Sequence, residues 1–256
     1  MDQRIANARH IYERGIRDGD IDDGLSVLGD RYTQHSQGVP DGPDGFRAFF
    51  EDFLGRHPVR DIELVRVLAD EDGVFVHAHQ DLDDGGDQWV TFDWFAFDDE
   101  DRIVEHWDVI APWTVDVPSG RTSTDGPTEV VDVDRTEDNR AVVHRALAQL
   151  LMPDGDVGGG LELIAEDYRQ HDGDVPDGRA ALAARLRRRA AQVRYHRIVR
   201  TTATGEFVAT LSEASRDGAP YAHADLFRLE GGLIVEHWGA SEAIGPPETW
   251  NNSGKF

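Results

Sequence analysis

Three residues in two strand-like runs have the types and spacing for acid–base chemistry. Asp93 lies within the aromatic run of residues 92–97, and His106 and Asp108 are one residue apart in the next run. Because successive side chains of a strand point to opposite faces, His106 and Asp108 share one face. A carboxyl group among aromatic side chains can donate a hydrogen bond, and an imidazole beside a carboxylate can hold a proton. The pattern predicts general acid–base chemistry.

Two further histidines, His77 and His79, share one face of a preceding strand-like run. A His-x-His pair on a strand can chelate a metal ion, and His35 or His106 could complete a mononuclear site. The same pair could instead line a polar pocket without a metal. We prefer the pocket, because spacing alone is a weak signal for a metal.

The chain repeats most of these features in its second half. A Tyr-x-Gln-His motif, a Val-Pro-Asp-Gly turn and an Ile-Val-Glu-His-Trp motif occur twice in the same order. Self-similarity of this kind predicts two copies of one fold. Three candidate residues have a counterpart in the second half. His171 corresponds to His35, Asp225 to Asp93, and His237 to His106. Such shared residues suit a scaffold role as well as a chemical one.

Other candidates occur only once. Gly239 stands where the first half has Asp108, and the motif spacing aligns His77 and His79 with Ala209 and Leu211. The asymmetry predicts that the first half carries the chemistry and that the second half is a degenerate copy, retained for binding or structure.

The elements that must position these residues follow from hydrophobic periodicity. Helical spacing begins at Ile5, a second helix is expected before Tyr32, and Phe46 to Leu54 form an apolar helical stripe. Strand-like runs follow, at 61–68, 74–82, 88–97 and 102–110. Helices followed by an antiparallel meander predict an α+β fold.

The second half repeats this order. Helices are expected at 139–152, 161–165 and 180–192, and strands at 195–202, 206–215, 221–229 and 233–240. The domain prediction is a first domain over 1–113, a polar linker over 114–136, and a second domain over 137–256 that ends in a polar tail. Trp250 and Phe256 could dock that tail on the body of a domain.

Together, the Tyr-x-Gln-His and Pro-Asp-Gly motifs, Phe46-Arg-Ala-Phe-Phe50, Asp93-x-Phe-x-Phe97 and Arg102-Ile-Val-Glu-His-Trp-Asp108 resemble SnoaL-like polyketide cyclases. These belong to the nuclear transport factor 2 superfamily, which also holds ketosteroid isomerase. The resemblance implies two tandem cone-shaped α+β barrels, each a curved antiparallel sheet wrapped against helices around a deep pocket. It also implies a covalently linked pseudo-dimer that can act as a monomer. No cofactor is expected.

The resemblance also suggests roles for site residues. Asp108 would be the general acid and base, His106 would support its charge, and Asp93 with His77 or His79 would stabilise an enolate oxygen. A simpler interpretation has Asp93 and Asp225 bond only the backbone or a neighbouring histidine. The substrate-binding candidates are residues that could line the pocket or its rim, namely His35, His77, His79, Trp94, Phe95 and Trp107.

Composition limits the environment and the partners. The chain has 256 residues, a net charge of −24, no cysteine, and one lysine, Lys255. A carboxylate-rich surface is typical of halophilic proteins and argues against nucleic-acid binding, since phosphates would be repelled. The absence of cysteine excludes disulfides and thiolate chemistry. No apolar run reaches membrane-spanning length, and none near the amino terminus suggests a signal peptide, so a cytoplasmic protein is expected.

Three functional hypotheses follow. The first is a cofactor-independent cyclase or isomerase that acts on an apolar carbonyl compound in the first domain. The second is a small-molecule binding or dimer-like interaction module without turnover. The third is a metal-dependent enzyme that uses His77 and His79.

Overall fold

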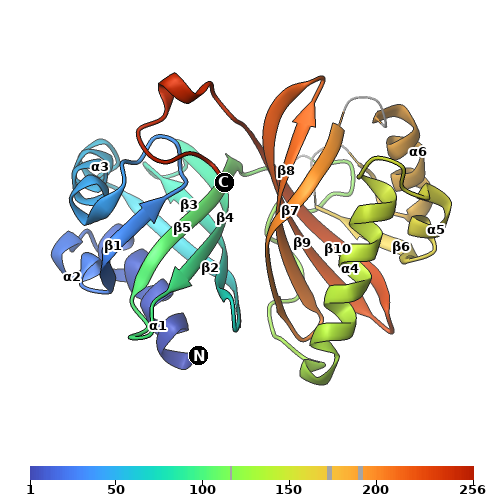
Figure 1. Ribbon diagram of the computed structural model, residues 1–256, viewed down its shortest axis with the longest axis horizontal. Coiled ribbons are helices and arrows are strands. Elements are labelled where there is room, and N and C mark those ends of the chain that lie inside the picture. Colours follow the sequence, from blue (N-terminus) through green and yellow to red (C-terminus); the bar gives the residue numbers. More distant parts are fainter. Residues whose placement is uncertain (116, 172–174, 190–192) are drawn as a thin grey trace. The chain divides into compact units, whose positions relative to one another are not determined.

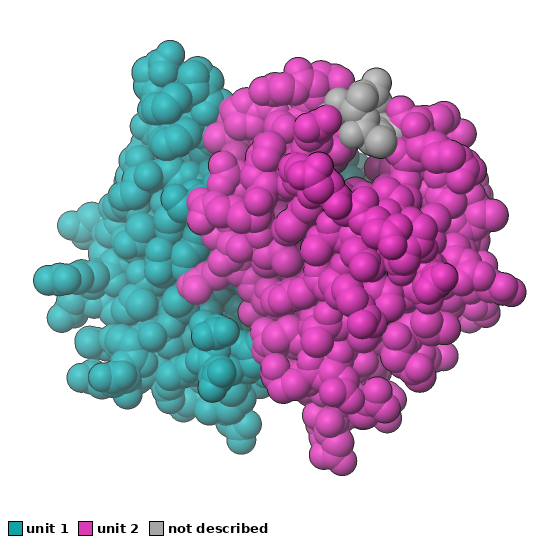
Figure 2. Space-filling view, turned by 45° about the vertical axis from the view of Figure 1, so that its right-hand side comes forward, with its two compact units in different colours: residues 1–112, 245–256 teal, residues 113–244 magenta. Residues whose placement is uncertain are grey.

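The computed structural model describes residues 1–115, 117–171, 175–189 and 193–256 (Figure 1). It divides into two compact units, coloured separately in Figure 2. Unit 1 contains residues 1–112 and 245–256, and unit 2 contains residues 113–244. Among the described residues, no helix combines the length and the apolar character needed to cross a membrane.

Unit 1 begins with helices and continues with a sheet. Its elements are α1 (Asp2–His10), the π-helical turn η1 (Ile11–Arg17), α2 (Ile21–Leu25), β1 (Leu28–Gln34), α3 (Gly42–Arg56), β2 (Arg60–Asp70), β3 (Gly73–Leu82), β4 (Asp87–Phe97), β5 (Ile103–Pro112) and the 3₁₀ turn η3 (Pro247–Thr249). Asp41 lies just before α3, and Pro43 occupies its first turn, where a missing backbone N–H costs nothing.

Unit 2 repeats the order. Its elements are the 3₁₀ turn η2 (Val133–Arg135), α4 (Thr136–Leu150), α5 (Val157–Leu161), β6 (Ile164–Gln170), α6 (Arg179–Arg189), β7 (Val193–Thr204), β8 (Phe207–Arg216), β9 (Ala219–Glu230) and β10 (Leu233–Ala243). The helix expected over 180–192 corresponds to α6, and residues 190–192 lie outside the described residues.

Each described sheet has five strands, ordered β1-β5-β4-β3-β2 in unit 1 and β6-β10-β9-β8-β7 in unit 2. The fold prediction is confirmed: the chain contains two tandem α+β cones. One local expectation is met only in part: the second helix before Tyr32 is present as α2, but it ends at Leu25, and Tyr32 to Gln34 lie on a strand that the sequence did not predict. This strand, β1, runs parallel to β5 and pairs Gln34 with His106, so long-range hydrogen bonds outweigh a weak local helical pattern.

The inner face of the unit 1 sheet packs against the helices. Val74, Val76 and Ala78 are fully buried in one apolar cluster with Tyr12 of η1 and Phe46 of α3. Because these strand residues have even numbers, the odd-numbered positions of β3 lie on the other face. The same rule identifies the inner face of β4 and β5.

The segment that follows the last strand of each cone differs from the predicted arrangement. Residues 245–256 were expected to end the second domain, but they belong to unit 1. The region expected to be a linker belongs to unit 2, where Trp238 Nε1 donates to Asp125 O at 2.8 Å and Val131 N donates to Glu206 Oε2 at 2.7 Å. Specific hydrogen bonds hold both segments, and composition alone did not reveal them.

Sheet register also corrects the alignment of the two halves. Val76 pairs with Asp93 in unit 1, and Thr210 pairs with Asp225 in unit 2. The counterparts of His77 and His79 are therefore the residues after Thr210 in the same alternation, Leu211 and Glu213, and not Ala209 and Leu211. The two histidines still occur only in unit 1.

Candidate active site

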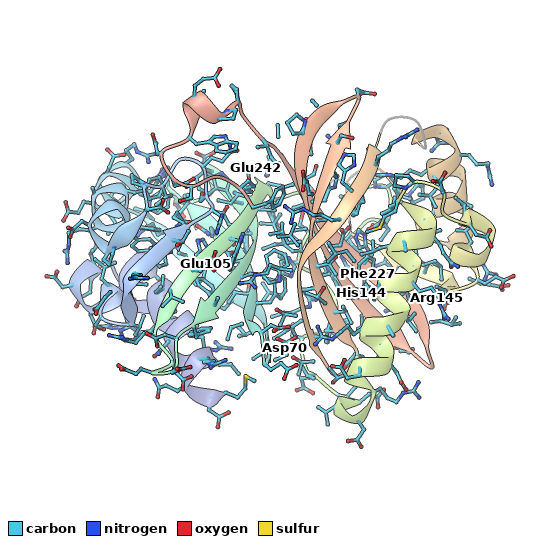
Figure 3. The ribbon with its side chains drawn as sticks, in the orientation of Figure 1. Asp70, Glu105, His144, Arg145, Phe227 and Glu242 are labelled. Atoms are coloured by element: carbon cyan, nitrogen blue, oxygen red, sulfur yellow. The ribbon has the colours of Figure 1, made fainter. Side chains whose placement is uncertain are left out.

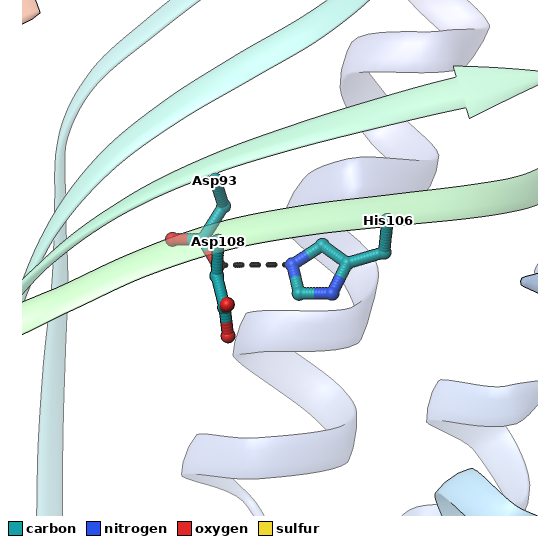
Figure 4. A group of neighbouring side chains, drawn as sticks. All are labelled: Asp93, His106 and Asp108. Carbon is teal, nitrogen blue, oxygen red and sulfur yellow. Dashed lines mark hydrogen bonds and ion pairs between the residues drawn. The ribbon is translucent and has the colours of Figure 1, made fainter. Parts of the chain in front are cut away.

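A histidine–carboxylate pair lies inside unit 1. His106 of β5 places Nε2 3.0 Å from Asp93 Oδ1 on β4, and both side chains are buried (Figure 4). Its other nitrogen, Nδ1, lies 2.9 Å from Gln34 Oε1. The imidazole therefore bridges a carboxylate and an amide.

The orientation of Gln34 determines where the protons lie. The backbone N–H of Ser36 donates to Gln34 Oε1 at 2.9 Å, while Gln34 Nε2 donates to the Tyr32 hydroxyl at 3.2 Å. Because Oε1 can only accept, Nδ1 of His106 must carry a hydrogen and donate it. One further proton is then shared between Nε2 and Asp93, as an imidazolium–carboxylate or an imidazole–carboxylic acid pair.

Unit 2 contains the same network. His237 places Nε2 2.9 Å from Asp225 Oδ1 and Nδ1 2.9 Å from Gln170 Oε1. The backbone N–H of His171 donates to Gln170 Oε1 at 2.9 Å, and Gln170 Nε2 donates to the Tyr168 hydroxyl at 3.2 Å. The Asp225–His237 pair thus also holds one shared proton.

A tyrosine approaches the carboxylate in each unit, but from a different element. Tyr195 of β7 donates its hydroxyl to Asp225 Oδ2 at 2.9 Å. In unit 1, Tyr12 of η1 lies near Asp93, and its pKa is raised by burial and then by the negative charge of Asp93. Sequence analysis missed Tyr12 and Tyr195, because they do not occupy matching positions in the repeat. It also missed Gln34 and Gln170, although both stand in the repeated Tyr-x-Gln-His motif.

Asp108, the acid found only in unit 1, is neutralised by a residue from the end of the described chain. Lys255 Nζ lies 3.0 Å from Asp108 Oδ1, and the lysine side chain is 1% exposed. Burial raises the pKa of Asp108, but the charges of Lys255 and His106 and the hydrogen bond from Lys255 outweigh burial and hold it below the usual range. The sole lysine of an arginine-rich chain was the signal that could have identified this partner.

His35 holds the segment that carries Lys255. Its Nδ1 donates to Gly254 O at 2.6 Å, its Nε2 lies 2.8 Å from Glu105 Oε1, and its ring stacks on Trp107 at 4.7 Å. Glu105 lies on β5 (Figure 3). His35 is therefore an anchor for the backbone of residues 245–256.

His171 has the same role in unit 2. Its Nδ1 donates to Thr122 O at 2.9 Å, its Nε2 lies 2.9 Å from Glu236 Oε1, and its ring stacks on Trp238 at 4.7 Å. Thr122 thus corresponds to Gly254, which makes Ser123 the counterpart of Lys255. Unit 2 therefore has neither partner of the Asp108–Lys255 ion pair.

One cavity is described in each unit, and the two differ strongly in volume. The unit 1 cavity measures about 80 Å³ and is lined by Tyr12, Asp93, His106 and Asp108 among others. The unit 2 cavity measures about 540 Å³. Its wall includes Tyr168, Gln170, Tyr195, Asp225, His237 and Gly239.

The predicted substrate-binding residues divide between the two faces of the unit 1 sheet. Phe95 lines the cavity with Asp93, as strand alternation requires. Trp94 and Trp107 lie on the other face, since their neighbours in the chain line the cavity. His77 and His79 alternate with Val76, Ala78 and Gln80, which face inward. The ring of His35 stacks on Trp107 and so belongs to that face as well. The structure therefore does not bring five of the candidates together with the Asp93–His106 pair, namely His35, His77, His79, Trp94 and Trp107.

Each possible metal site has a protein cation beside it. Ligand atoms of Asp93, His106 and Asp108 lie within 4.8 Å of one another, but Lys255 supplies the positive charge there. The Nε2 lone pair that a metal would require is already engaged with Asp93. At the other candidate, Arg66 Nη1 donates to His77 Nδ1 at 3.1 Å, which places a cation beside the imidazole.

Comparison with known proteins identifies the family of the chain. Two solved structures are similar to part of the chain. An NTF2-like protein from Burkholderia xenovorans is 21% identical over 42% of this chain and 91% of that chain, with a TM-score of 0.36. An LEH-like epoxide hydrolase from M. tuberculosis is 20% identical over 42% of this chain and 85% of that chain, also with a TM-score of 0.36. No curated protein matches the chain significantly. The sequence profile described as SnoaL-like domain matches residues 8–106 and 144–237. Since these two matches span more than half of the chain, the protein belongs to the SnoaL-like domain family, with one copy in each unit.

Proposed function

We propose that unit 2 binds a small apolar carbonyl compound and transfers a proton next to its carbonyl group, with the Asp225–His237 pair as base and acid. Membership of the family supports a domain that binds or processes a small molecule. The observation that carries the proposal is the cavity of about 540 Å³ around this pair. Ligand pockets commonly measure about 300–1,000 Å³.

This proposal moves the chemistry away from the unit that the sequence favoured. The residues predicted to act there were Asp108 as the base, with His106 and Asp93 in support. In the folded chain Asp108 is buried in an ion pair with Lys255, and the cavity beside it measures about 80 Å³. The same histidine–carboxylate pair is available in unit 2 with far more space.

The proposed reaction uses groups already in contact. A carbonyl compound enters beside Tyr195, and its oxygen accepts the hydroxyl hydrogen that now goes to Asp225 Oδ2. Asp225 then takes a proton from the carbon next to the carbonyl, while His237 balances the carboxylate charge and Tyr195 stabilises the enolate oxygen. Return of that proton to another carbon completes an isomerisation. Attack of the enolate on a second carbonyl of the same molecule, with protonation of the new alkoxide, completes a cyclisation.

A test needs no knowledge of the natural substrate. We would incubate 2-tetralone with the protein in deuterated buffer and follow loss of its exchangeable C–H signals by NMR. The wild type should accelerate exchange, and Asp225→Asn should slow it at least about 100-fold, the usual contribution of a general base. Asp93→Asn is the matched control, because it alters the same pair in the small cavity and should leave exchange unchanged.

The opposite outcome is equally clear. If Asp93→Asn abolishes exchange and Asp225→Asn does not, the chemistry belongs to unit 1. Saturable binding of 2-tetralone by the wild type without any exchange would instead support a binding module.

A further inference from the structure

The cavity of unit 2 carries a cluster of polar residues that unit 1 lacks. On β9 and β10, His223 pairs with Ser241. This pair lies two positions along each strand from the pairing of Asp225 with Gly239. Both His223 and Ser241 line the cavity. The corresponding pair in unit 1 is Thr91 with Ile110, beside Asp93 and Asp108.

The third member of the cluster is Arg216, at the end of β8. The strand register shows which residue of unit 1 it matches. Val76 pairs with Asp93, and Leu82 follows Val76 by six residues. In the same way Thr210 pairs with Asp225, and Arg216 follows Thr210 by six residues. Arg216 is therefore the counterpart of Leu82, which is fully buried in the unit 1 core. An apolar position in one cone has become a cation at the cavity of the other.

The surroundings of Arg216 leave its charge without compensation. Its Nη2 donates to Ser241 Oγ at 2.9 Å, and its guanidinium lies 4.5 Å from the ring centre of Tyr221. Within the described part of the chain it pairs with no carboxylate, and its Nε is buried without a hydrogen-bond partner. This is unexpected in a chain with 50 acidic and 26 basic residues. A partly buried cation is stabilised by an anion, and none of the described residues supplies one.

The rest of the wall has the same bias. Arg185 and Arg194 also line the cavity, and Asp154 is the one acidic residue among the described lining apart from Asp225 of the pair. Much of the remaining wall is aliphatic, with residues such as Leu147, Leu150 and Leu182. A ligand that matches this wall has an apolar body and one negatively charged end.

We propose that the ligand of unit 2 carries a carboxylate, which Arg216 binds with help from Ser241. Ser241 lies two positions along β10 from Gly239, which pairs with Asp225, so the carboxylate lies roughly 7 Å from the reacting carbonyl. The substrate class is therefore an apolar keto acid. The reaction of such a substrate rests on the proposed function, but the recognition of a carboxylate does not.

Two probes of the same shape test the recognition. We would measure the dissociation constants of 4-phenylbutanoate and 4-phenylbutanamide by isothermal titration calorimetry with the full chain. The wild type should bind the carboxylate at least about tenfold more tightly, since an arginine–carboxylate pair is charge-assisted and bidentate. Arg216→Leu, which installs the residue of unit 1, should remove the preference, and Arg216→Lys should retain part of it.

Arg197→Leu is the matched control. It removes the same charge from unit 2, but Arg197 is exposed and pairs with Glu213 on the sheet, away from the cavity lining. It should keep the wild-type preference. Equal or absent binding of both probes by the wild type, or a preference that survives in a folded Arg216→Leu variant, would overturn the proposal.

The outcomes separate this inference from the proposed function. Arg216-dependent binding of the carboxylate, together with no exchange of 2-tetralone, would retain the inference and contradict the function. Exchange that depends on Asp225, with no preference between the probes, would do the reverse.

Discussion

The ammonium group of Lys255 lies 3.0 Å from the carboxylate of Asp108, although 147 residues separate them in the chain. The pair occurs only in unit 1, where unit 2 has Ser123 and Gly239. Gly239 lines the larger cavity, and a Cβ added to it would lie 2.9 Å from His237 Cε1. The position of the buried acid in one cone is thus part of the cavity wall in the other.

Lys255→Met should destabilise unit 1 strongly. It leaves Asp108 buried without its partner, and breaking a buried pair in this way costs about 3–5 kcal/mol. The free energy of unfolding from urea titration measures the loss. Replacing both partners, as Lys255→Met with Asp108→Leu, should restore much of it. A loss below about 1 kcal/mol in the single variant, as for an exposed ion pair, would contradict this role.

The same pair predicts how stability depends on pH. The pKa of Asp108 in the folded chain lies below its usual value. Burial alone would raise this pKa, but the opposing effect, which comes chiefly from Lys255, is larger. A lowered carboxyl pKa contributes stability that is fully present above the unfolded value, about 3.9, and is lost as pH falls through the folded value. Calorimetric melting from pH 7 to pH 3 should therefore show the wild type losing stability relative to the double variant below about pH 4. A constant difference in melting temperature over this range would argue against it.

Gly239→Asp should close the unit 2 cavity. The new side chain would crowd His237 and fill the space that distinguishes the two cones, so exchange of 2-tetralone and probe binding should each fall at least about tenfold. Gly55→Asp is a suitable control, because an added Cβ there meets nothing within 4 Å. Unchanged binding in a folded Gly239→Asp variant would show that this cavity does not hold the ligand.

Tyr195→Phe should slow exchange with little effect on substrate affinity. The hydroxyl donates to Asp225 now and to the enolate oxygen in the proposed reaction, and loss of one such donor costs about 10²–10³ in rate. Steady-state kinetics should show the loss in kcat and not in KM. Tyr12→Phe removes the analogous hydroxyl from unit 1 and should leave both constants unchanged. A loss confined to Tyr12→Phe would assign the chemistry to the smaller cavity.

The fold and part of the site were accessible from sequence because they depend on local and repeated patterns. The duplication predicted two copies of one α+β fold, and strand alternation placed His106 and Asp108 on one face. Asp93 was correctly associated with them, since β4 and β5 are consecutive strands that pair in register. The aromatic candidates were harder, because alternation does not say which face of a strand is concave, and Trp94 and Trp107 lie on the other face.

Other features depended on contacts between distant parts of the chain. The sequence by itself determined the repeat, four of the five described strands in each unit, and the residue types of the acid–base group. Only the tertiary structure decided that Lys255 neutralises Asp108, that Tyr195 reaches Asp225, and that the open cavity lies in unit 2. These depend on packing between residues far apart in the chain, and periodicity carries no information about the volume that such packing leaves empty.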